Sequence, residues 1–227
     1  MTEPTRESGP RPRKTRSDGE RSRSAILREA AQLATVEGLE GLSISRLAEA
    51  VGMSKSGLFA HFGSKEELQL ATIETASGIF NEQVVEPANL AGTGLERLRQ
   101  LCENFLRHVQ ESVFPGGCFF ASVAAEMDTH PGPVRDLAMQ LTDDWRRQLE
   151  QAVRDAQAEG AVDPSEDAAQ LAFELNAYLL LANAQFVAGQ DSTPIERARR
   201  AIAHRLDHRP VASVEDTALE GVFPAPG

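Results

Sequence analysis

The sequence predicts an all-α protein, built from a small N-terminal helix-turn-helix domain and a larger helical domain that follows it. Apolar residues recur at the spacing of one helix face along most of the chain, and no stretch alternates between polar and apolar residues as a half-buried strand does. Ser, Thr or Asp stands before most of these stretches and Gly follows several of them, as at helix starts and ends. The helical spacing of the apolar residues and the capping residues together therefore predict helices along most of the chain.

The composition is that of an ordinary globular protein. With 41% hydrophobic and 25% charged residues, the chain is neither collagen-like nor wholly disordered. Its two cysteines, Cys102 and Cys118, are too few for a disulfide framework and fit a reducing compartment. No apolar segment of a secretory signal precedes Arg23, and the densest apolar run, near residues 178–187, is shorter than the ~20 residues that cross a bilayer. We therefore expect a cytoplasmic protein with no membrane partner.

Charge is distributed unevenly along the chain. Residues 1–65 hold 11 Lys and Arg against 8 Asp and Glu, a net charge of +3, whereas the remainder holds 12 basic and 26 acidic residues, a net charge of −14. Spread evenly, the overall charge of −11 would argue against a nucleic-acid partner. The asymmetry leaves such a partner open for the N-terminal part.

Four segments are predicted. Residues 1–23 carry seven basic and four acidic side chains, with Pro and Gly among them and no apolar residue after Met1, so we expect a disordered basic arm. Residues 24–68 form the helix-turn-helix domain and residues 69–207 the larger helical domain. Residues 208–227 are a tail without a clear period.

The N-terminal domain contains two short helices joined by a tight turn. Ser43 is expected to cap the first helix, Gly52 to end it in the left-handed conformation, and Ser54 to cap the second. Ser64 opens the next helix, with Glu67 reaching back to the Ser64 amide. Later helices are expected at about residues 93–109, 118–128, 133–160, 164–189 and 194–207.

The helix-turn-helix predicts a face for DNA, because in this motif the second helix enters the major groove with its N-terminal residues while the first supports it. The outward side chains are Lys55, Ser56, Gly57 and His61 on the second helix and Ser45 and Arg46 on the first. Lys and Ser can meet phosphates or base edges, and Gly57 lets the backbone approach the groove. Similar helix pairs also occur in proteins that never touch DNA, so the motif alone leaves both alternatives open.

The stretch LSISRLAEAVGMSKSGLFAHFGSKEEL, residues 42–68, closely resembles the DNA-binding domain of the TetR family of transcriptional regulators. Beyond about residue 70 the chain resembles the family in its run of helices and in the segment GGCFFASVAAEMD. The resemblance implies a homodimer that binds a palindromic double-stranded DNA operator, usually as a repressor, and leaves it when a small-molecule effector enters the C-terminal domain. The resemblance implies that three residues contact bases or the groove: Lys55, Ser56 and Gly57. It implies that four others contact phosphates: Ser43, Arg46, His61 and Lys65.

One position departs from the family pattern. Where the family usually has Tyr, whose hydroxyl meets a phosphate, this chain has Phe59, which lacks that donor. DNA affinity would then depend more on Lys55, Lys65 and the Arg-rich arm, although the arm could also be a solvated tail with no role.

The larger domain is expected to provide the dimer interface and the effector site. Its last two helices, residues 164–189 and 194–207, should pack against those of a second copy, because the first of them is apolar nearly all round. Burial of that helix within one monomer is the alternative. A predominantly apolar effector would bind among residues that are otherwise plain core: Phe80, Cys102, Phe105, Phe119, Phe120, Trp145, Phe173 and Asn176.

The chain carries no motif of an enzyme. It has no nucleotide-binding Gly fingerprint, no phosphate loop, no Gly-x-Ser-x-Gly elbow and no paired-His metal motif. Cys118 has no basic neighbour in sequence that would activate it. We expect no catalytic residue, cofactor or metal site, although Glu126 and His130 stand four residues apart. A helical interaction protein that keeps the helix-turn-helix shape but no longer binds DNA remains the alternative.

Overall fold

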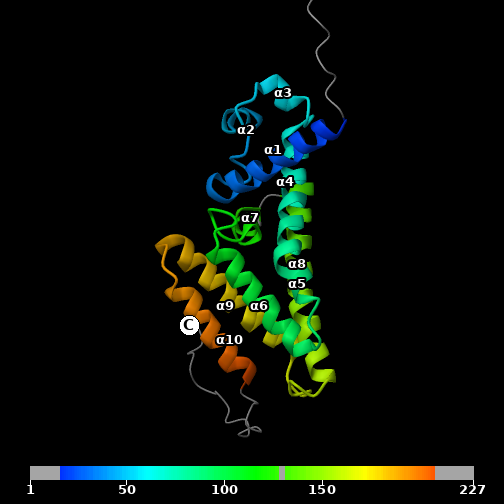
Figure 1. Ribbon diagram of the computed structural model, residues 1–227, viewed down its shortest axis with the longest axis vertical. Coiled ribbons are helices and arrows are strands. Elements are labelled where there is room, and N and C mark those ends of the chain that lie inside the picture. Colours follow the sequence, from blue (N-terminus) through cyan, green and yellow to red (C-terminus); the bar gives the residue numbers. More distant parts are fainter. Residues whose placement is uncertain (1–15, 128–130, 208–227) are drawn as a thin grey trace, which may run out of the picture.

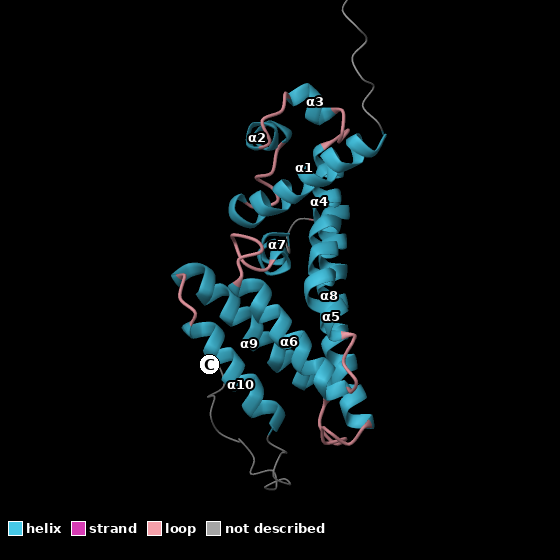
Figure 2. Cartoon of the chain, viewed as in Figure 1, coloured by secondary structure: helices cyan, strands magenta, loops and turns pink. Residues whose placement is uncertain are grey.

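The computed structural model describes residues 16–127 and 131–207, and all regular structure in these ranges is helical, as the sequence predicts (Figures 1 and 2). The elements are α1 (Arg16–Glu37), α2 (Ile44–Ala50), α3 (Lys55–Phe59), α4 (Lys65–Phe80), the π-helix η1 (Asn81–Val85), α5 (Glu86–Ala88), α6 (Gly94–Gln110), α7 (Phe119–Met127), α8 (Pro133–Ala158), α9 (Ala168–Gly189) and α10 (Thr193–Asp207). In Figure 1, α1–α3 form one end, α6, α9 and α10 lie toward the other, and α7 lies between them.

The first helix begins earlier than the sequence indicates. Residues 16–23 were expected to belong to the disordered arm, and that expectation is wrong because they form the first turns of α1; residues 1–15 and the tail 208–227 lie outside the described ranges. Arg and Glu are good helix formers and need no burial, so they extend a helix whose apolar face is anchored further along. The Arg23 guanidinium lies 5.0 Å from the centroid of the Phe62 ring. This contact places the basic extension beside the end of α3.

Serine caps define the helix-turn-helix. The cap hydroxyls accept backbone N–H groups at the starts of α2, α3 and α4: Ser43 from Arg46 at 3.2 Å, Ser54 from Gly57 at 3.1 Å and Ser64 from Glu67 at 3.0 Å. Gly52 adopts a left-handed φ of +65° between α2 and α3, as expected. The Glu67 carboxylate reaches back to the Gly63 N–H at 2.8 Å, one residue before the amide predicted for it.

Helix α9 begins later than expected, because Asp167 and not Asp163 is its N-cap. The Asp167 carboxylate accepts N–H groups of the first helical turn at 2.9 and 3.3 Å. Asp163 instead accepts the N–H and hydroxyl of Ser165 at 2.8 and 2.7 Å in a separate turn. The Gln157 side-chain amide donates to the carbonyls of Asp163 and Glu166 at 3.0 and 2.8 Å, which holds this turn against α8.

Two hydrophobic cores meet at α7. The first core joins α1–α4 with Phe119, Val123 and Met127 of α7 and with the start of α8. The second lies among α6, α8, α9 and α10, and Phe120 packs against both cores. The core of the N-terminal domain therefore extends well past residue 68, the expected boundary.

The end of α4 continues into one turn of π-helix beside the second core. The Asn104 side-chain amide donates to the Val84 carbonyl at 3.0 Å, and His108 Nδ1 donates to Gln83 Oε1 at 2.8 Å. Burial lowers the pKa of His108 to about 4, so the ring is neutral near pH 7. Short π-helical turns often accompany functional sites, and this one carries Asn81, which lines the cavity described below.

One side of α9 is left uncovered. Among the described residues, α9 is the one helix that is long and apolar enough to span a membrane, by length and composition alone. Leu175 and Leu179 are fully buried in the second core, whereas Phe173 and Leu181 are 67% and 59% exposed. A helix that buries one apolar side and exposes another is typical of an association surface.

Candidate nucleic-acid interface and ligand cavity

A shallow groove lies on the surface of α2, α3 and the start of α4. Leu47 and Ala48 of α2 and Leu58 of α3 are no more than 2% exposed, and their packing fixes the two helices against each other. The groove is lined by Ile44 and by six of the nine residues that the sequence assigns to DNA: Ser43, Ser45, Lys55, Ser56, Phe59 and Lys65.

Two cations of this face bind carboxylates at the end of α1 and in the turn that follows it. Arg46 donates to both oxygens of Glu37 at 2.6–3.0 Å, and these hydrogen bonds raise the pKa of Arg46 above its ordinary value. Lys65 Nζ donates to the Glu40 carbonyl at 2.7 Å and to its carboxylate at 3.0 Å. The side chains of Arg46 and Lys65 are 39% and 44% exposed, so both ion pairs are partly hydrated and add little stability. Neither ion pair therefore binds its cation strongly.

The remaining residues of the expected interface flank the groove. A Cβ added at Gly57 would lie 3.0 Å from the Ser54 hydroxyl that caps α3, so a larger residue here would press on the cap. His61 is half-buried, with its ring centroid 6.2 Å from that of Phe62. Phe59 is 55% exposed and belongs to neither core, so its ring gives the groove an apolar surface beside the lining side chains of Lys55 and Lys65.

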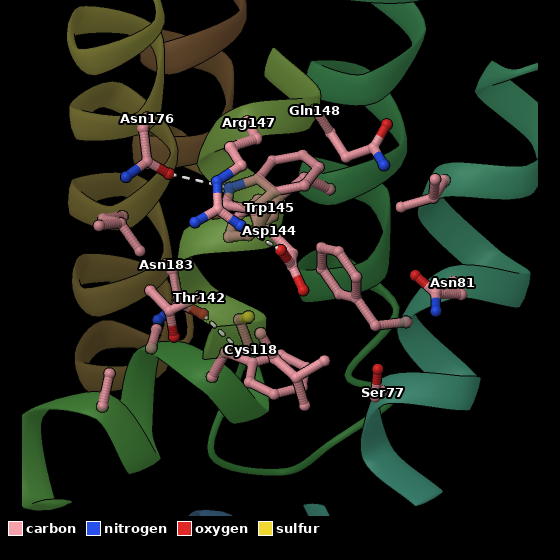
Figure 3. Close-up of a pocket in the computed structure, with 18 of the residues that line it drawn as sticks. Ser77, Asn81, Cys118, Thr142, Asp144, Trp145, Arg147, Gln148, Asn176 and Asn183 are labelled. Atoms are coloured by element: carbon pink, nitrogen blue, oxygen red, sulfur yellow. Dashed lines mark hydrogen bonds and ion pairs between the residues drawn. The ribbon is translucent and has the colours of Figure 1, made fainter. Parts of the chain in front are cut away.

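The larger domain encloses a cavity of about 820 Å³ among α4, η1, α6, α7, α8 and α9 (Figure 3). Aromatic rings from four helices form one wall. The Trp145 ring centroid lies 5.2 Å from Phe80, edge to face, and 5.7 Å from Phe105, stacked, while Phe80 and Phe120 are 6.0 Å apart. Five of the eight expected effector-site residues line this cavity: Phe80, Phe105, Phe120, Trp145 and Asn176.

Polar side chains line much of the rest, and most of them were missed in the sequence. Trp145 Nε1 donates to Asn176 Oδ1 at 3.0 Å, and Arg147 donates to Asp144 at 2.6 Å (Figure 3). The further polar lining residues are Ser77, Asn81, Thr142, Gln148, Gln151 and Asn183. Residues 144, 147, 148 and 151 share one face of α8, a spacing visible in the sequence but equally typical of a solvated helix face.

Three expected effector-site residues lie elsewhere. Cys102 is buried in the second core facing α10, Phe119 belongs to the first core, and Phe173 is exposed on α9. Helix phase explains the error at α7, because the adjacent residues Phe119 and Phe120 point to different sides of one helix. Cys118, which was not assigned to the site, does line the cavity.

The chemistry of these residues is that of binding. Burial raises the pKa of the Cys118 thiol to about 11 and that of Cys102 to about 12, so both are protonated and weak nucleophiles near pH 7. Within residues 16–127 and 131–207, no group of three or more His, Cys, Asp or Glu side chains is placed to hold a metal ion. His130, which the sequence offered as a partner of Glu126, lies outside these ranges.

Fold and site define a class of protein: a helix-turn-helix domain joined to a helical domain with a ligand-sized cavity. Residues 26–72 match the family described as "Bacterial regulatory proteins, tetR family", and residues 94–202 match the family described as "Tetracyclin repressor-like, C-terminal domain". The chain belongs to the TetR family of bacterial transcriptional regulators.

Named relatives are similar over different parts of the chain. The HTH-type transcriptional repressor AcnR of Corynebacterium efficiens is 40% identical over 65 residues, which are 29% of this chain and 35% of AcnR. The chain thus covers about a third of the length of this repressor, and the same holds for AcnR of Corynebacterium glutamicum. A TetR transcriptional regulator from Chloroflexus aurantiacus is similar in structure with a TM-score of 0.78 and 26% identity over 85% of this chain and 98% of its own. AibR, solved in complex with isovaleryl coenzyme A and operator DNA, has a TM-score of 0.67 and 26% identity over 80% and 97%.

Trp145 makes the cavity directly testable, because it is the single tryptophan of the chain and lines the cavity. We expect the dye 1-anilinonaphthalene-8-sulfonate to bind in the cavity and to accept excitation energy transferred from the Trp145 fluorophore. Ala121→Phe, which fills space from α7, should weaken the dye about tenfold, or ~1.4 kcal/mol. Ala161→Phe, exposed in the turn after α8, is the matched control and should bind the dye as the wild type does. Equal binding by all three proteins would show that the dye does not enter this cavity.

Proposed function

We propose that this protein is a transcriptional repressor that binds a palindromic DNA operator as a homodimer and leaves it when a small molecule occupies the cavity. The observation that carries the proposal is that one chain combines the cation-bearing groove of α2 and α3 with a ligand-sized cavity. Helix α4 belongs to both sites, because Lys65 at its start borders the groove and Ser77 and Phe80 at its end line the cavity. Such a regulator acts in the cytoplasm, where its DNA is.

The DNA interface is proposed to be the groove and its surroundings. Lys55, Ser56 and Gly57 at the start of α3 would meet base edges or the groove floor, and Ser43, Ser45, Arg46, His61 and Lys65 would meet phosphates. The basic extension of α1, which lies beside the end of α3 through Arg23, adds positive charge next to this face. AibR is similar in structure over most of both chains and was solved on its operator, which supports this assignment.

The dimer interface is proposed to be the uncovered side of α9 together with α10. Phe173 and Leu181 are large apolar side chains more than half exposed, and α9 packs on α10 along its length. Pairing α9 and α10 with those of a second copy would form a four-helix bundle and bury this side.

The effector is proposed to be amphipathic: an apolar body against Phe80, Phe105, Phe120 and Trp145, and a polar group toward the Asp144 and Arg147 face of α8. The sequence alone favoured a predominantly apolar effector, and the polar lining of the cavity is the reason for this refinement. Isovaleryl coenzyme A, the small molecule of the AibR complex, also joins an apolar acyl group to a polar body. A ligand releases DNA only if it prefers the conformation with misplaced recognition helices.

Selection from a random duplex library tests DNA binding. We expect a palindrome with half-sites about one helical turn apart, roughly 34–36 Å. Lys65→Ala should weaken all sequences alike and reduce the slope of log affinity against log salt by about one, because one phosphate contact is lost. Arg146→Ala, which removes an exposed cation paired with Asp143 on α8, is the charge-matched control and should leave the slope unchanged.

Two outcomes would contradict these expectations. An unchanged slope in Lys65→Ala would refute its phosphate contact, and the absence of any enriched duplex would favour the helical interaction protein instead. A library of amphipathic compounds is then tested on the protein bound to the selected duplex. Some compounds should release the wild-type protein from this duplex and release the Ala121→Phe variant less readily.

Phe59→Tyr should tighten operator binding. A hydroxyl on this exposed ring could donate to a phosphate oxygen, and such a charge-assisted hydrogen bond contributes about 1.5 kcal/mol, or roughly tenfold in affinity. Phe59→Leu keeps the position apolar without a ring or hydroxyl and should not tighten binding. An affinity of Phe59→Tyr within a factor of two of the wild type would place Phe59 away from the DNA backbone.

Leu181→Glu should convert the dimer to a monomer and abolish tight operator binding, because it places a charge on the uncovered side of α9. Leu90→Glu is the matched control, since Leu90 is 87% exposed and lies in the loop between α5 and α6. Sedimentation velocity and operator binding report on both variants. A stable Leu181→Glu monomer that still binds the palindrome tightly would overturn the dimer assignment.

A further inference from the structure

The helix α7 presents different sides to the two functional regions. Phe119, Val123 and Met127 recur at every fourth position and are buried in the core of the N-terminal domain. Phe120, Ala121 and Ala124 lie on another side of the same helix and line the cavity. A ligand in the cavity would therefore touch a helix that also belongs to the core of the N-terminal domain. In Figure 1, α7 lies between α1–α3 and the helices of the larger domain.

One side chain of α7 also holds the backbone of the turn between α1 and α2. Glu126 Oε2 accepts the Leu39 N–H at 2.7 Å, and Glu126 Oε1 accepts the Glu40 N–H at 2.8 Å. Hydrogen bonds to an ionised acceptor are stronger than those between neutral groups. Two of them from adjacent amides fix both the distance and the orientation of the turn relative to the Glu126 carboxylate. Gly38 has a φ of +81°, and a Cβ there would lie 2.8 Å from Glu126 Oε1, so the close approach depends on glycine.

The same turn and the end of α1 before it hold two cations of the DNA-facing surface, Lys65 and Arg46. Glu40 binds Lys65 through both its carbonyl and its carboxylate, at 2.7 and 3.0 Å. Glu37, at the end of α1, binds Arg46 through both carboxylate oxygens. Through its amides, the turn therefore contacts Glu126 of the helix that lines the cavity. Through Glu40, it contacts Lys65, one of the proposed phosphate contacts.

The start of α7 is tied to both regions as well. The Gly116 N–H donates to the Thr35 hydroxyl of α1 at 3.1 Å, and a Cβ at Gly116 would lie 2.0 Å from the Thr35 carbonyl oxygen. The Cys118 N–H donates to Asn183 Oδ1 at 2.8 Å, and Cys118 and Asn183 both line the cavity. The segment 116–127 therefore contacts α1 at one end, the following turn at the other, and the cavity in between.

We propose that Glu126 is a positioning residue that couples occupancy of the cavity to the DNA-binding face. A ligand that displaces α7 pulls the Glu126 carboxylate away from the amides of residues 39 and 40 and breaks these hydrogen bonds. The turn is then released, and Glu37 and Glu40 no longer hold Arg46 and Lys65 in positions that match the operator phosphates. This connection rests on the proposed function and acts beside α4, which itself reaches the turn where Gln69 donates to the Leu39 carbonyl at 2.8 Å.

The test measures how filling the cavity affects DNA binding with and without this contact. Leu141→Trp enlarges a lining residue of α8 and serves as the probe in place of an unidentified effector. Leu141 also packs against the first core but contributes no atom to the Glu126 contact, so an effect through this packing would persist in Glu126→Ala. It is combined with Glu126→Ala and, as the matched control, with Glu159→Ala. Glu159 accepts the Gly94 N–H through both oxygens at 3.0 and 2.8 Å, a comparable carboxylate–amide contact between α8 and the start of α6.

Operator affinity and hydrogen exchange at the amides of residues 39 and 40 are the two readouts. Leu141→Trp should weaken operator binding about tenfold in the wild-type and Glu159→Ala backgrounds and less than twofold in Glu126→Ala. Leu141→Trp should also raise exchange at these two amides at least as much as Glu126→Ala does. Melting temperatures of the single variants separate this coupling from a general loss of stability, which both alanine substitutions share.

Three results would overturn the proposal. A weakening by Leu141→Trp that persists in Glu126→Ala would assign the coupling to α4 or to the packing of α8 on the first core. A Leu141→Trp variant that binds the operator as the wild type does would show that the cavity is not coupled through α7. Unchanged exchange at residues 39 and 40 in Leu141→Trp would show that the turn does not follow the cavity. If the wild type binds no duplex, the proposed function fails first, and the exchange measurement still decides whether cavity and turn are linked.

Discussion

The burial of α7 against two cores at once is the constraint on which the rest of the structure depends. A nine-residue helix cannot be buried on one side by α1–α4 and on another by the cavity wall unless both regions keep a fixed distance from it. Phe119, Val123 and Met127 are buried in the first core, so the N-terminal domain is not an independent unit joined by a linker. Under the proposed coupling, a displacement of α7 from its cavity side would be transmitted to this core, because a close-packed interior absorbs little displacement.

The ion pairs of the proposed DNA-binding face are weak. Arg46 is held by Glu37 at the end of α1 and Lys65 by Glu40 in the turn that follows, and both pairs are partly exposed to water. Exposed pairs contribute little to stability, so exchange of a carboxylate for a phosphate loses little on the protein side. The part of the chain beyond residue 65 has a net charge of −14, and such a charge disfavours a polyanion there, which agrees with the proposed DNA-binding face at the N-terminal end.

The cavity combines an aromatic wall with a polar face of α8, and this division limits which molecules bind well. Stacked and edge-to-face rings favour a flat apolar group. Asp144 and Arg147 bind each other and their side chains are 46% and 68% exposed, so a polar group of a ligand would meet them at the solvent-facing side of the cavity. Burial keeps the Cys118 thiol that lines the cavity protonated near pH 7, so it is a weak nucleophile.

The sequence by itself determined the helices and the helix-turn-helix, because caps such as Ser43, Ser54 and Ser64 and the apolar period act over a few residues and need no distant partner. It also identified the residues around the groove, because α2 and α3 are adjacent in the chain. It failed where neighbours in sequence point apart, as Phe119 and Phe120 do, and where two caps compete, as Asp163 and Asp167 do. Only the tertiary structure decided that Asp144, Arg147 and Gln148 face a cavity and that Glu126 binds amides 86 and 87 residues away, because such contacts depend on how whole helices pack and not on their local period.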